Sequence, residues 1–328
     1  MDNAETVLGG LRLRLPSPLE ELRDDRLGGV RLFLKRDDLI HPELPGNKWR
    51  KLKYNLAEAD SQEKSTLLTF GGAYSNHIRA TAAAGYHFGF ATIGVIRGEE
   101  HLPLNPSLAY AVSRGMRLVY LDRATYRAKD RPEVISRLRA EWGDFYLVPE
   151  GGSNAYAVRG CAELPVEIEA RFGAQADDLN GRPLPRGPGG HGFDVICCPC
   201  GTGGTLAGIA AGLSGGGRAI GFPVLKGGGF LAEEVRRLQQ EAFGVSWSNW
   251  TLECGFHFGG YAKTTKGLLA FVEDFAVRHD LLLDRIYVAK MMYGIFDLVD
   301  RGNFPRGTRI VAVITGGPGP EQAFRGLA

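Results

Sequence analysis

Lys48 lies in the segment Gly46-Asn47-Lys48-Trp49-Arg50-Lys51-Leu52, where a turn signal precedes residues that favour a helix. Asn47 is a good N-cap, so the helix is expected to start at Lys48. The apolar residues that follow form one stripe, namely Trp49, Leu52, Leu56 and Ala59. Lys48 falls on the edge of that stripe, whereas Arg50 and Lys53 are expected to point away and Lys51 to lie just outside it. A partly desolvated lysine loses basicity and becomes an amine nucleophile that forms imines with carbonyl groups. The alternative is a solvated, basic helix start.

A second segment, Gly71-Gly72-Ala73-Tyr74-Ser75-Asn76-His77, connects an apolar strand pattern to an alanine-rich helix. Ser75 is the expected N-cap, and the first N–H groups of a helix lack partners within the helix. Such a helix start binds a carboxylate well, which predicts a carboxylate clamp at residues 75–77. The alternative is a plain capped turn, and His77 taken alone is more often structural than catalytic.

Glycine-rich and hydroxyl-bearing turns follow two further predicted strands. Cys200-Gly201-Thr202-Gly203-Gly204-Thr205-Leu206 follows a strand at 194–198 and fits a phosphate cradle. The dinucleotide fingerprint requires glycine where Leu206 stands, and the Walker ending Gly-Lys-Ser/Thr is absent, so a phosphate monoester fits best. Thr315 ends the strand at 309–314, where a hydroxyl points into the ligand crevice. Tyr261 and Tyr287 each adjoin a predicted turn or strand, although either alone is more often a packed aromatic.

Strand and helix patterns alternate along the chain, which predicts parallel sheets covered on both faces. The predicted strands are 66–70, 91–96, 116–121, 145–148, 194–198, 219–224 and 309–314. The predicted helices are near 75–89, 105–114, 130–141, 155–172, 204–213, 230–242, 264–279 and 289–300. The Pro/Gly-rich stretch 177–192 is predicted to be a surface insertion.

Composition narrows the class of protein. The 328 residues suffice for two lobes, and a formal net charge of +2 gives no electrostatic case for binding nucleic acid or an anionic membrane. The start of the chain lacks a signal-peptide pattern, and no apolar run approaches a membrane span, so we expect a cytoplasmic protein. Five cysteines fit reduced thiols. Cys197-x-x-Cys200 could be a redox or zinc half-site, but no second pair follows, so buried strand thiols and no metal site are expected.

Eight motifs occur in a fixed order over roughly residues 30–320. They are Lys-Arg-Asp-Asp at 35–38, Gly-Asn-Lys at 46–48, Gly-Gly at 71–72, Ser-Asn-His at 75–77, Pro-Glu-Gly-Gly-Ser-Asn at 149–154, Gly-Thr-Gly-Gly-Thr at 201–205, Tyr287 with Lys290, and Thr-Gly-Gly at 315–317. In this set the chain resembles pyridoxal 5'-phosphate-dependent enzymes of fold type II. Within them it resembles the aminocyclopropane-carboxylate deaminase / D-cysteine desulfhydrase family.

The resemblance implies two open, twisted, mostly parallel sheets with helices on both faces. It implies a large cofactor-binding domain at 1–49 and 159–328, a small domain at 50–158, and a homodimer. Lys48 would hold the cofactor as an imine and then move the substrate's proton. The other implied roles are Asn76 on the phenolic oxygen, Gly201, Thr202, Gly203, Gly204 and Thr205 on the phosphate, Ser75 with the backbone of Asn76 and His77 on the substrate carboxylate, and Tyr261 and Tyr287 on the substrate side.

The chain departs from the family pattern at three places. Tyr74 replaces a common Gln beside Ser75, and Ala289 replaces a Gly before Lys290. Val288 stands where ring-opening members carry a Glu that pairs with the pyridine nitrogen, which leaves Thr315 as a neutral partner. A neutral partner weakens delocalisation into the ring, so α,β-elimination from D-cysteine or a similar small amino acid is favoured over ring opening. The alternatives are an aminocyclopropane-carboxylate deaminase, a racemase or dehydratase with the same cofactor, a weakly catalytic binding protein, or a nicotinamide enzyme, which Leu206 disfavours.

Overall fold

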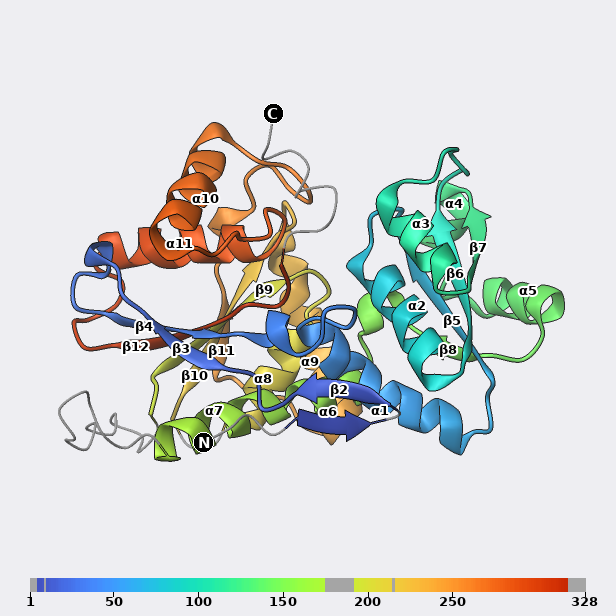
Figure 1. The fold of residues 1–328 in the computed structure, drawn as a ribbon, viewed down its shortest axis with the longest axis horizontal. Helices are drawn as coiled ribbons and strands as arrows, with labels where there is room; N and C mark the ends of the chain where they lie inside the picture. Colours follow the sequence, from blue (N-terminus) through green and yellow to red (C-terminus); the bar gives the residue numbers. More distant parts are fainter. Residues whose placement is uncertain (1–4, 9, 175–191, 214–215, 318–328) are drawn as a thin grey trace.

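Two sheets, each with helices on both faces, make up most of the structure (Figure 1). The computed structural model describes residues 5–8, 10–174, 192–213 and 216–317 of the chain. A separate antiparallel ribbon pairs β1 (Glu5–Leu8) with β2 (Leu11–Arg14). The α/β fold class predicted from the sequence is confirmed.

The larger sheet has the strand order β11-β10-β9-β12-β4-β3. Its strands are β3 (Leu19–Leu22), β4 (Arg31–Lys35), β9 (Val195–Cys200), β10 (Arg218–Pro223), β11 (Trp250–Leu252) and β12 (Arg309–Val313). All neighbouring pairs are parallel except β3 with β4. One face packs against α10 (Lys266–His279) and α11 (Val288–Asp300). The other packs against α7 (Glu163–Ala174), α8 (Gly204–Gly212) and α9 (Leu231–Phe243).

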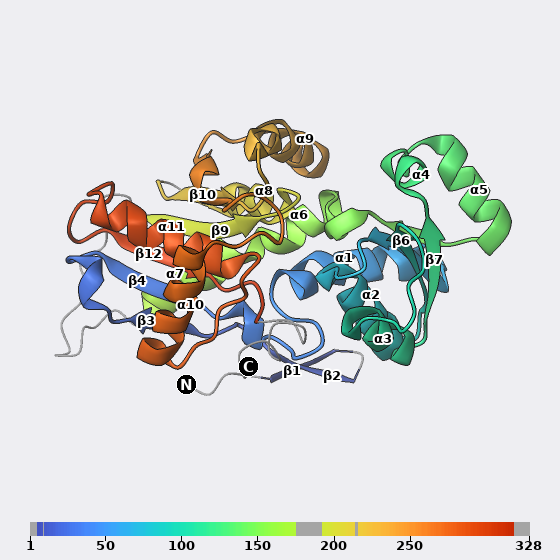
Figure 2. The ribbon, with the colours of Figure 1, turned by 90° about the horizontal axis from the view of Figure 1, so that it is seen from above.

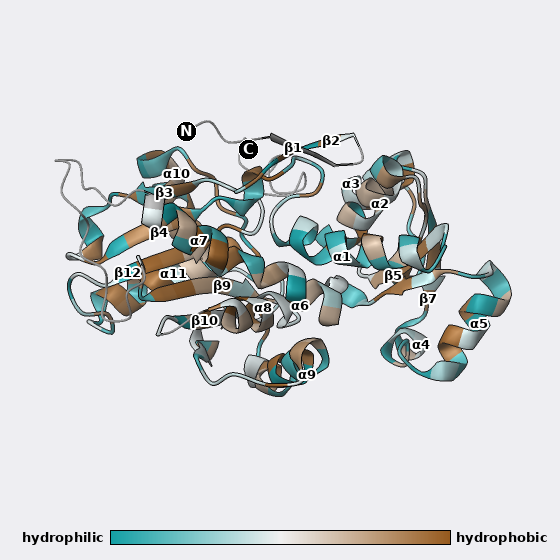
Figure 3. Cartoon of the chain, turned by 90° about the horizontal axis from the view of Figure 1, so that it is seen from below, coloured by the Kyte–Doolittle hydropathy of each residue, from teal (hydrophilic) through white to brown (hydrophobic). Residues whose placement is uncertain are grey.

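Burial on both faces explains the nearly continuous apolar sequence of the central strands. Cys197 packs in the cluster of one face and its neighbour Cys198 in the cluster of the other. Hydrophobic residues accordingly concentrate along β9, β12 and α11 (Figure 3). All five cysteines are free thiols, and Cys197, Cys198 and Cys200 are buried in β9, as the sequence predicted.

The smaller sheet is entirely parallel and has the order β7-β6-β5-β8. Its strands are β5 (Thr66–Gly71), β6 (Ala91–Arg97), β7 (Met116–Leu121) and β8 (Tyr146–Val148). The helices around it are α1 (Asn47–Ser61), α2 (Asn76–Phe88), α3 (Pro106–Ser113), α4 (Arg123–Arg127) and α5 (Pro132–Trp142). Residues on one face of β5 pack with α1 and α2, and residues on the other pack with α4 and α5.

Helix α6 (Ala155–Cys161) joins the two halves because it packs on both α1 and α8 (Figure 2). Glycine permits the contact with α1, since a Cβ atom on Gly160 would lie 1.9 Å from the carbonyl oxygen of Arg50. This packing places the start of α1 beside the start of α8, where two of the predicted motifs lie.

Several boundaries differ from those predicted. Helix α1 starts at Asn47 with Gly46 as its N-cap, so Asn47 is not the cap. The segment 155–172 forms two helices, α6 and α7. Tyr287 caps α11 and does not end a strand. The elements β1, β2, β3, β4, β11 and α4 were not among the predicted strands and helices. All but one residue of the 177–192 stretch lies outside the described residues.

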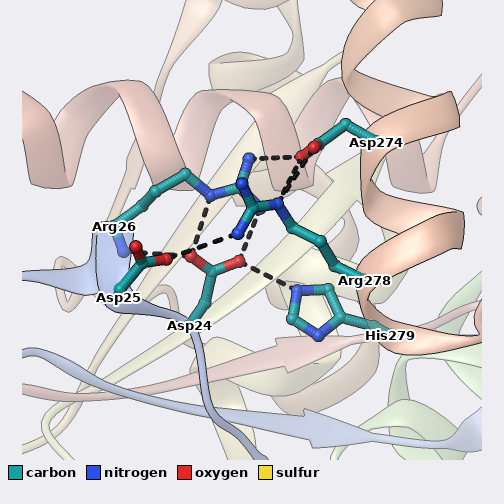
Figure 4. Close-up of polar contacts among 6 residues, drawn as sticks. All are labelled: Asp24, Asp25, Arg26, Asp274, Arg278 and His279. Atoms are coloured by element: carbon teal, nitrogen blue, oxygen red, sulfur yellow. Dashed lines mark hydrogen bonds and ion pairs between the residues drawn. The ribbon is translucent and has the colours of Figure 1, made fainter.

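A polar cluster ties the 3-10 helix η1 (Asp25–Leu27) to α10 (Figure 4). This Asp24 cluster consists of Asp24, Asp25, Arg26, Asp274, Arg278 and His279. Asp24 accepts hydrogen bonds from Arg26 Nε at 2.8 Å and pairs with His279 Nε2 at 2.9 Å. Arg26 reaches Asp274 at 2.7 Å, and Arg278 contacts the same carboxylate at 2.9 Å. The cluster therefore joins segments about 250 positions apart at the surface.

Candidate active site

A cavity of about 800 Å³ lies at the carboxyl ends of strands from both sheets. It collects nearly all of the predicted site residues, namely Lys48, Tyr74, Ser75, Asn76, His77, Gly201, Thr202, Gly203, Thr205, Tyr261, Tyr287 and Thr315. Gly204 is the exception, because it is buried behind this wall against Ser153 and Lys51. Within the described residues, no group of His, Cys, Asp and Glu side chains is arranged to hold a metal ion. None of the helices in those ranges is long and apolar enough to span a membrane.

Lys48 projects from the first turn of α1 into the cavity wall. Desolvation there, followed by repulsion from Lys51, lowers the pKa of its amine to about 7. No hydrogen bond or ion pair joins its Nζ to another group in the described part of the chain. The amine is thus in part unprotonated at neutral pH, as a nucleophile must be.

The turn before Lys48 is fixed by a contact with the end of β12. Gly46 has a φ of 61° and donates its N–H to the carbonyl oxygen of Asp37 at 2.8 Å. A Cβ atom at this position would lie 1.8 Å from the carbonyl oxygen of Thr315. Only glycine satisfies both conditions.

Two cations of α1, Arg50 and Lys51, are buried. Arg50 was expected to point away from the apolar stripe, and Lys51 was expected to lie just outside it. Arg50 is 1% exposed, and Lys51 is 3% exposed. Lys51 Nζ donates to Ser153 Oγ at 3.0 Å and to the carbonyl oxygen of Gly151 at 3.2 Å. The prediction failed because α7 and the turn at 150–153 pack on this side of α1 and supply polar partners.

Arg50 anchors a buried ion network beneath α1, which we call the Arg50 network and which consists of Lys35, Asp37, Arg50 and Glu167. Arg50 binds both carboxylate oxygens of Asp37, at 2.7 and 2.8 Å. It also binds both oxygens of Glu167, at 2.8 and 2.9 Å. Lys35 Nζ lies 2.9 Å from Glu167. The network joins β4, α1 and α7, so it holds the helix that carries Lys48.

The glycine turn after β9 forms an open cradle of backbone N–H groups at the start of α8. Gly203 is the N-cap with a φ of 78°, so the first helical N–H groups have no partners within the helix. A Cβ atom on Gly204 would lie 2.8 Å from Ser153 Oγ and 3.2 Å from Lys51 Nζ. Thr202 Oγ1 lies 2.5 Å from Ser153 Oγ. The cradle, the hydroxyls and the buried cation together suit a phosphate ester. Lys51 and Ser153 were not predicted, although Lys51 lies one helical turn after Lys48.

The start of α2 forms the second N–H cluster. Ser75 is the N-cap, and its Oγ accepts hydrogen bonds from the backbone N–H groups of His77 and Ile78 at 3.2 and 3.3 Å. The ring of His77 is buried and lies 2.8 Å from Thr69 Oγ1. Burial and the charges of Lys48 and Lys51 hold the pKa of His77 well below its usual value, so the ring is neutral. Its ring is therefore part of the core, while its backbone belongs to the helix start.

Tyr261 and Tyr287 meet edge to face, with ring centroids 6.0 Å apart. Desolvation raises the pKa of both phenols, so both hydroxyls are protonated at neutral pH and can act as acids. Lys290 Nζ fixes the loop before Tyr261 by donating to the carbonyl oxygens of His257 and Gly260 at 2.9 and 2.8 Å. Burial lowers the pKa of Lys290 to about 8.

Val288 packs in the core of the larger sheet and does not line the cavity. Ala289 beside it is buried in the same cluster. Thr315 and Asp284 do line the cavity, and the Asp284 carboxylate accepts the backbone N–H of Tyr287 at 2.7 Å.

A family model described as "Pyridoxal-phosphate dependent enzyme" matches residues 11–316. The chain belongs to this family. The pyridoxal-phosphate-dependent family and its cofactor, predicted from the ordered motifs, are therefore confirmed. In this family the cofactor provides a carbonyl group for an amine and a conjugated ring that accepts electrons. The low-pKa amine of Lys48 fits the cofactor's carbonyl group, and the glycine cradle at 201–205 fits its phosphate ester.

The relatives carry two activities in their names. A putative 1-aminocyclopropane-1-carboxylate deaminase of Pyrococcus furiosus is 30% identical over 92% of this chain and 89% of its own. The bifunctional D-cysteine desulfhydrase/1-aminocyclopropane-1-carboxylate deaminase, mitochondrial, of Arabidopsis thaliana is 30% identical over 92% of this chain and 76% of its own. A solved structure, an ACC deaminase homologue, superimposes with a TM-score of 0.77 at 28% identity over 94% of this chain and 92% of its own.

Proposed function

We propose that this pyridoxal-phosphate-dependent enzyme is a lyase that eliminates the β-substituent of a small amino acid, most suitably D-cysteine. The net reaction converts cysteine and water into pyruvate, ammonia and hydrogen sulfide. The proposal depends on where two residues lie: Val288 is buried in the core, and Thr315 lines the cavity. A pyridine nitrogen paired with a neutral hydroxyl would stabilise negative charge in the cofactor ring less than a nitrogen paired with a carboxylate. Loss of a β-substituent removes that negative charge directly. Opening of the cyclopropane ring depends more on delocalisation of the charge into the pyridine ring.

In this proposal Lys48 would hold the cofactor through its amine and, once the substrate's amine has displaced it, would accept the proton from the substrate's α-carbon. The N–H groups of residues 201–205, with Thr202 and Thr205, hold the phosphate, and Lys51 supplies positive charge behind them. Asn76 donates a hydrogen bond to the phenolic oxygen. Ser75, with the backbone of Asn76 and His77, holds the substrate carboxylate, and Tyr74 forms the wall beside it. Tyr261 and Tyr287 donate a proton to the leaving sulfur.

Three broader features belong to the same proposal. The larger sheet receives its strands from residues 19–35 and 195–313, and the smaller from 66–148. This supports a large domain of 1–49 and 159–328 and a small domain of 50–158. We further propose a homodimer in the cytoplasm, and light scattering of the purified protein measures the oligomeric state.

A screen for pyruvate release across D- and L-amino acids tests the activity, with aminocyclopropane carboxylate assayed for its own keto-acid product. We expect pyruvate from D-cysteine and little ring opening; comparable turnover of both substrates would contradict the proposal. Lys48→Ala should remove both turnover and the visible absorbance of lysine-bound cofactor. Lys53→Ala is the matched control, because Lys53 lies on the same helix and pairs with Glu163 away from the cavity.

The names of the relatives favour ring opening of aminocyclopropane carboxylate as the second candidate. It requires the same amine, clamp and cradle, so those residues do not separate the two reactions. Thr315→Glu would place a carboxylate after β12, at the position proposed to face the pyridine nitrogen. If ring opening rises in that variant while D-cysteine turnover falls, the neutral partner is what sets the reaction.

A further inference from the structure

Five acidic residues line the cavity, and each carboxylate already has a partner on the protein. The pairs are Asp38 with Arg36 at 2.9 Å, Glu43 with His87 at 2.6 Å, Glu150 with Tyr126 at 2.9 Å, Glu234 with Arg237 at 2.6 Å, and Asp284 with the backbone N–H of Tyr287 at 2.7 Å. Each carboxylate of the wall is therefore held by a contact within the protein, from side chains outside the cavity except for Asp284, which accepts the N–H of Tyr287 in the cavity wall.

Arg97 differs from these residues. It ends β6, lines the cavity and is exposed. Its guanidinium carbon lies 5.9 Å from the ring centroid of Tyr126. No ion pair or hydrogen bond joins it to a carboxylate in the part of the chain that the structure describes. An arginine keeps its charge at any physiological pH, so this charge is open to a ligand.

Strand register places Arg97 beside the proposed carboxylate clamp. Gly71 of β5 pairs with Ile96 of β6, so Gly72 and Arg97 are neighbours at the end of the sheet. A Cβ atom on Gly72 would lie 3.8 Å from Arg97 Nη2, so glycine leaves the guanidinium room beside the turn that leads to Ser75. The N–H groups of α2 already suit the α-carboxylate, which leaves the charge of Arg97 for a second anion.

Arg97 also lies within electrostatic reach of the proposed acid. Desolvation raises the pKa of Tyr261, and the positive charge of Arg97 is among the influences that oppose this rise. The cavity of about 800 Å³ holds both the proposed cofactor site and Arg97 on its wall.

We propose that Arg97 binds a second negative charge on the substrate, so that a β-substituent that ends in a carboxylate is preferred over a neutral substituent of the same shape. Guanidinium and carboxylate groups form two parallel hydrogen bonds, which makes this recognition specific for the anion. This inference rests on the proposed elimination. For S-carboxymethylcysteine the α C–H and Cβ–S bonds break, the sulfur leaves as a thiol with a proton from a cavity acid, and water completes the products pyruvate and ammonia.

The test compares S-carboxymethylcysteine with S-carbamoylmethylcysteine, its neutral amide of nearly the same shape, in both enantiomeric forms. We expect kcat/KM for the carboxylate to exceed that for the amide by roughly tenfold or more, as a hydrogen-bonded charge pair supports. In Arg97→Gln this ratio should fall to about one, while D-cysteine turnover changes little. Arg117→Gln is the control, because Arg117 lies in the neighbouring strand β7, stacks on Trp142 and does not line the cavity.

Two results would overturn the inference: a ratio near one in the unaltered enzyme, or an equal loss for both compounds in Arg97→Gln. The second result would assign Arg97 to the α-carboxylate or to the fold. Titration of the cofactor's absorbance with the two compounds gives the same ratio as dissociation constants, without turnover. If no amino acid releases pyruvate, elimination is wrong, yet this binding ratio still decides the role of Arg97.

Discussion

The Arg50 network and the Asp24 cluster are built from the same kinds of ion pairs but lie in different surroundings. Arg50 and Asp37 are almost fully buried, whereas the side chains of Arg26 and Arg278 are 32% and 46% exposed. Each group joins segments distant in the chain. Only the Arg50 network, however, holds the helix that carries Lys48. The comparison indicates that burial decides how much an ion pair affects stability, and that position decides whether it affects the site.

Asp37→Asn should have the largest effect. It leaves Arg50 buried with one anionic partner lost, and breaking a buried pair in this way costs about 3–5 kcal/mol. Because the Asp37 carboxylate binds Arg50 and so holds the helix that carries Lys48, we expect weaker binding of pyridoxal phosphate as well. Urea unfolding and cofactor titration measure the two effects. A loss of stability below about 1 kcal/mol would show that the network tolerates the missing charge, and the comparison would fail.

Asp24→Asn should have an intermediate effect. The Asp24 carboxylate is buried within its cluster, accepts a hydrogen bond from Arg26 and pairs with His279. Hydrogen bonds to charged groups contribute about 1.5–3 kcal/mol. None of the residues of the cluster lines the cavity, so cofactor affinity should stay unchanged. Weaker cofactor binding in this variant would mean that the two groups are coupled through the sheet.

The contribution of Glu167 to the free energy of unfolding should depend on pH, unlike that of a neutral glutamine at the same position. Burial raises the pKa of Glu167, but hydrogen bonds and charges from Arg50 and Lys35 outweigh it and lower the pKa to about 2. A depressed pKa gives stability that is present above about pH 4.5 and is lost as the pH falls toward 2. The difference in free energy of unfolding between the original protein and Glu167→Gln should therefore be largest near pH 7 and shrink below pH 4.5. A difference independent of pH would mean that packing, not charge, is what Gln disturbs.

Arg278→Gln should have the smallest effect, because Arg278 and Asp274 are both well exposed and exposed ion pairs contribute little to stability. A double-mutant cycle on this pair should lose its coupling energy in about 1 M salt. The same cycle on Arg50 and Glu167 should keep most of its coupling, since buried pairs are screened little. Equal salt dependence in both cycles would contradict the contrast.

The sequence was sufficient to predict a helix cap or a turn where the residues that form it are neighbours in the chain. Ser75 caps α2 as predicted, and the glycines at 201 and 203 form the turn into α8. Most of the parallel strands were predictable because their sequences are apolar, but β4 and β11 were not among the predicted strands although each pairs in parallel. Residues 19–22 and 250–252 were missed because edge strands are short and carry polar residues.

Partners from distant segments account for what the sequence did not reveal. Arg50 and Lys51 are buried because α7 and the turn at 150–153 supply their partners. Helix periodicity contains no information on those contacts. Arg97 attracted no notice because an arginine at a strand end is common, and only the pairing of every cavity acid makes it distinct.

The contact between Gly46 and Thr315 links two functions that are 269 positions apart in the chain. The residue that would hold the cofactor's aldehyde end and the one that would meet its pyridine nitrogen are carried by backbones in direct contact. The span available to the cofactor is therefore determined by main-chain dimensions, which do not change when the surrounding side chains do. Substrate preference can diverge at Tyr74, Arg97 or Thr315 while the length of the cofactor slot stays constant.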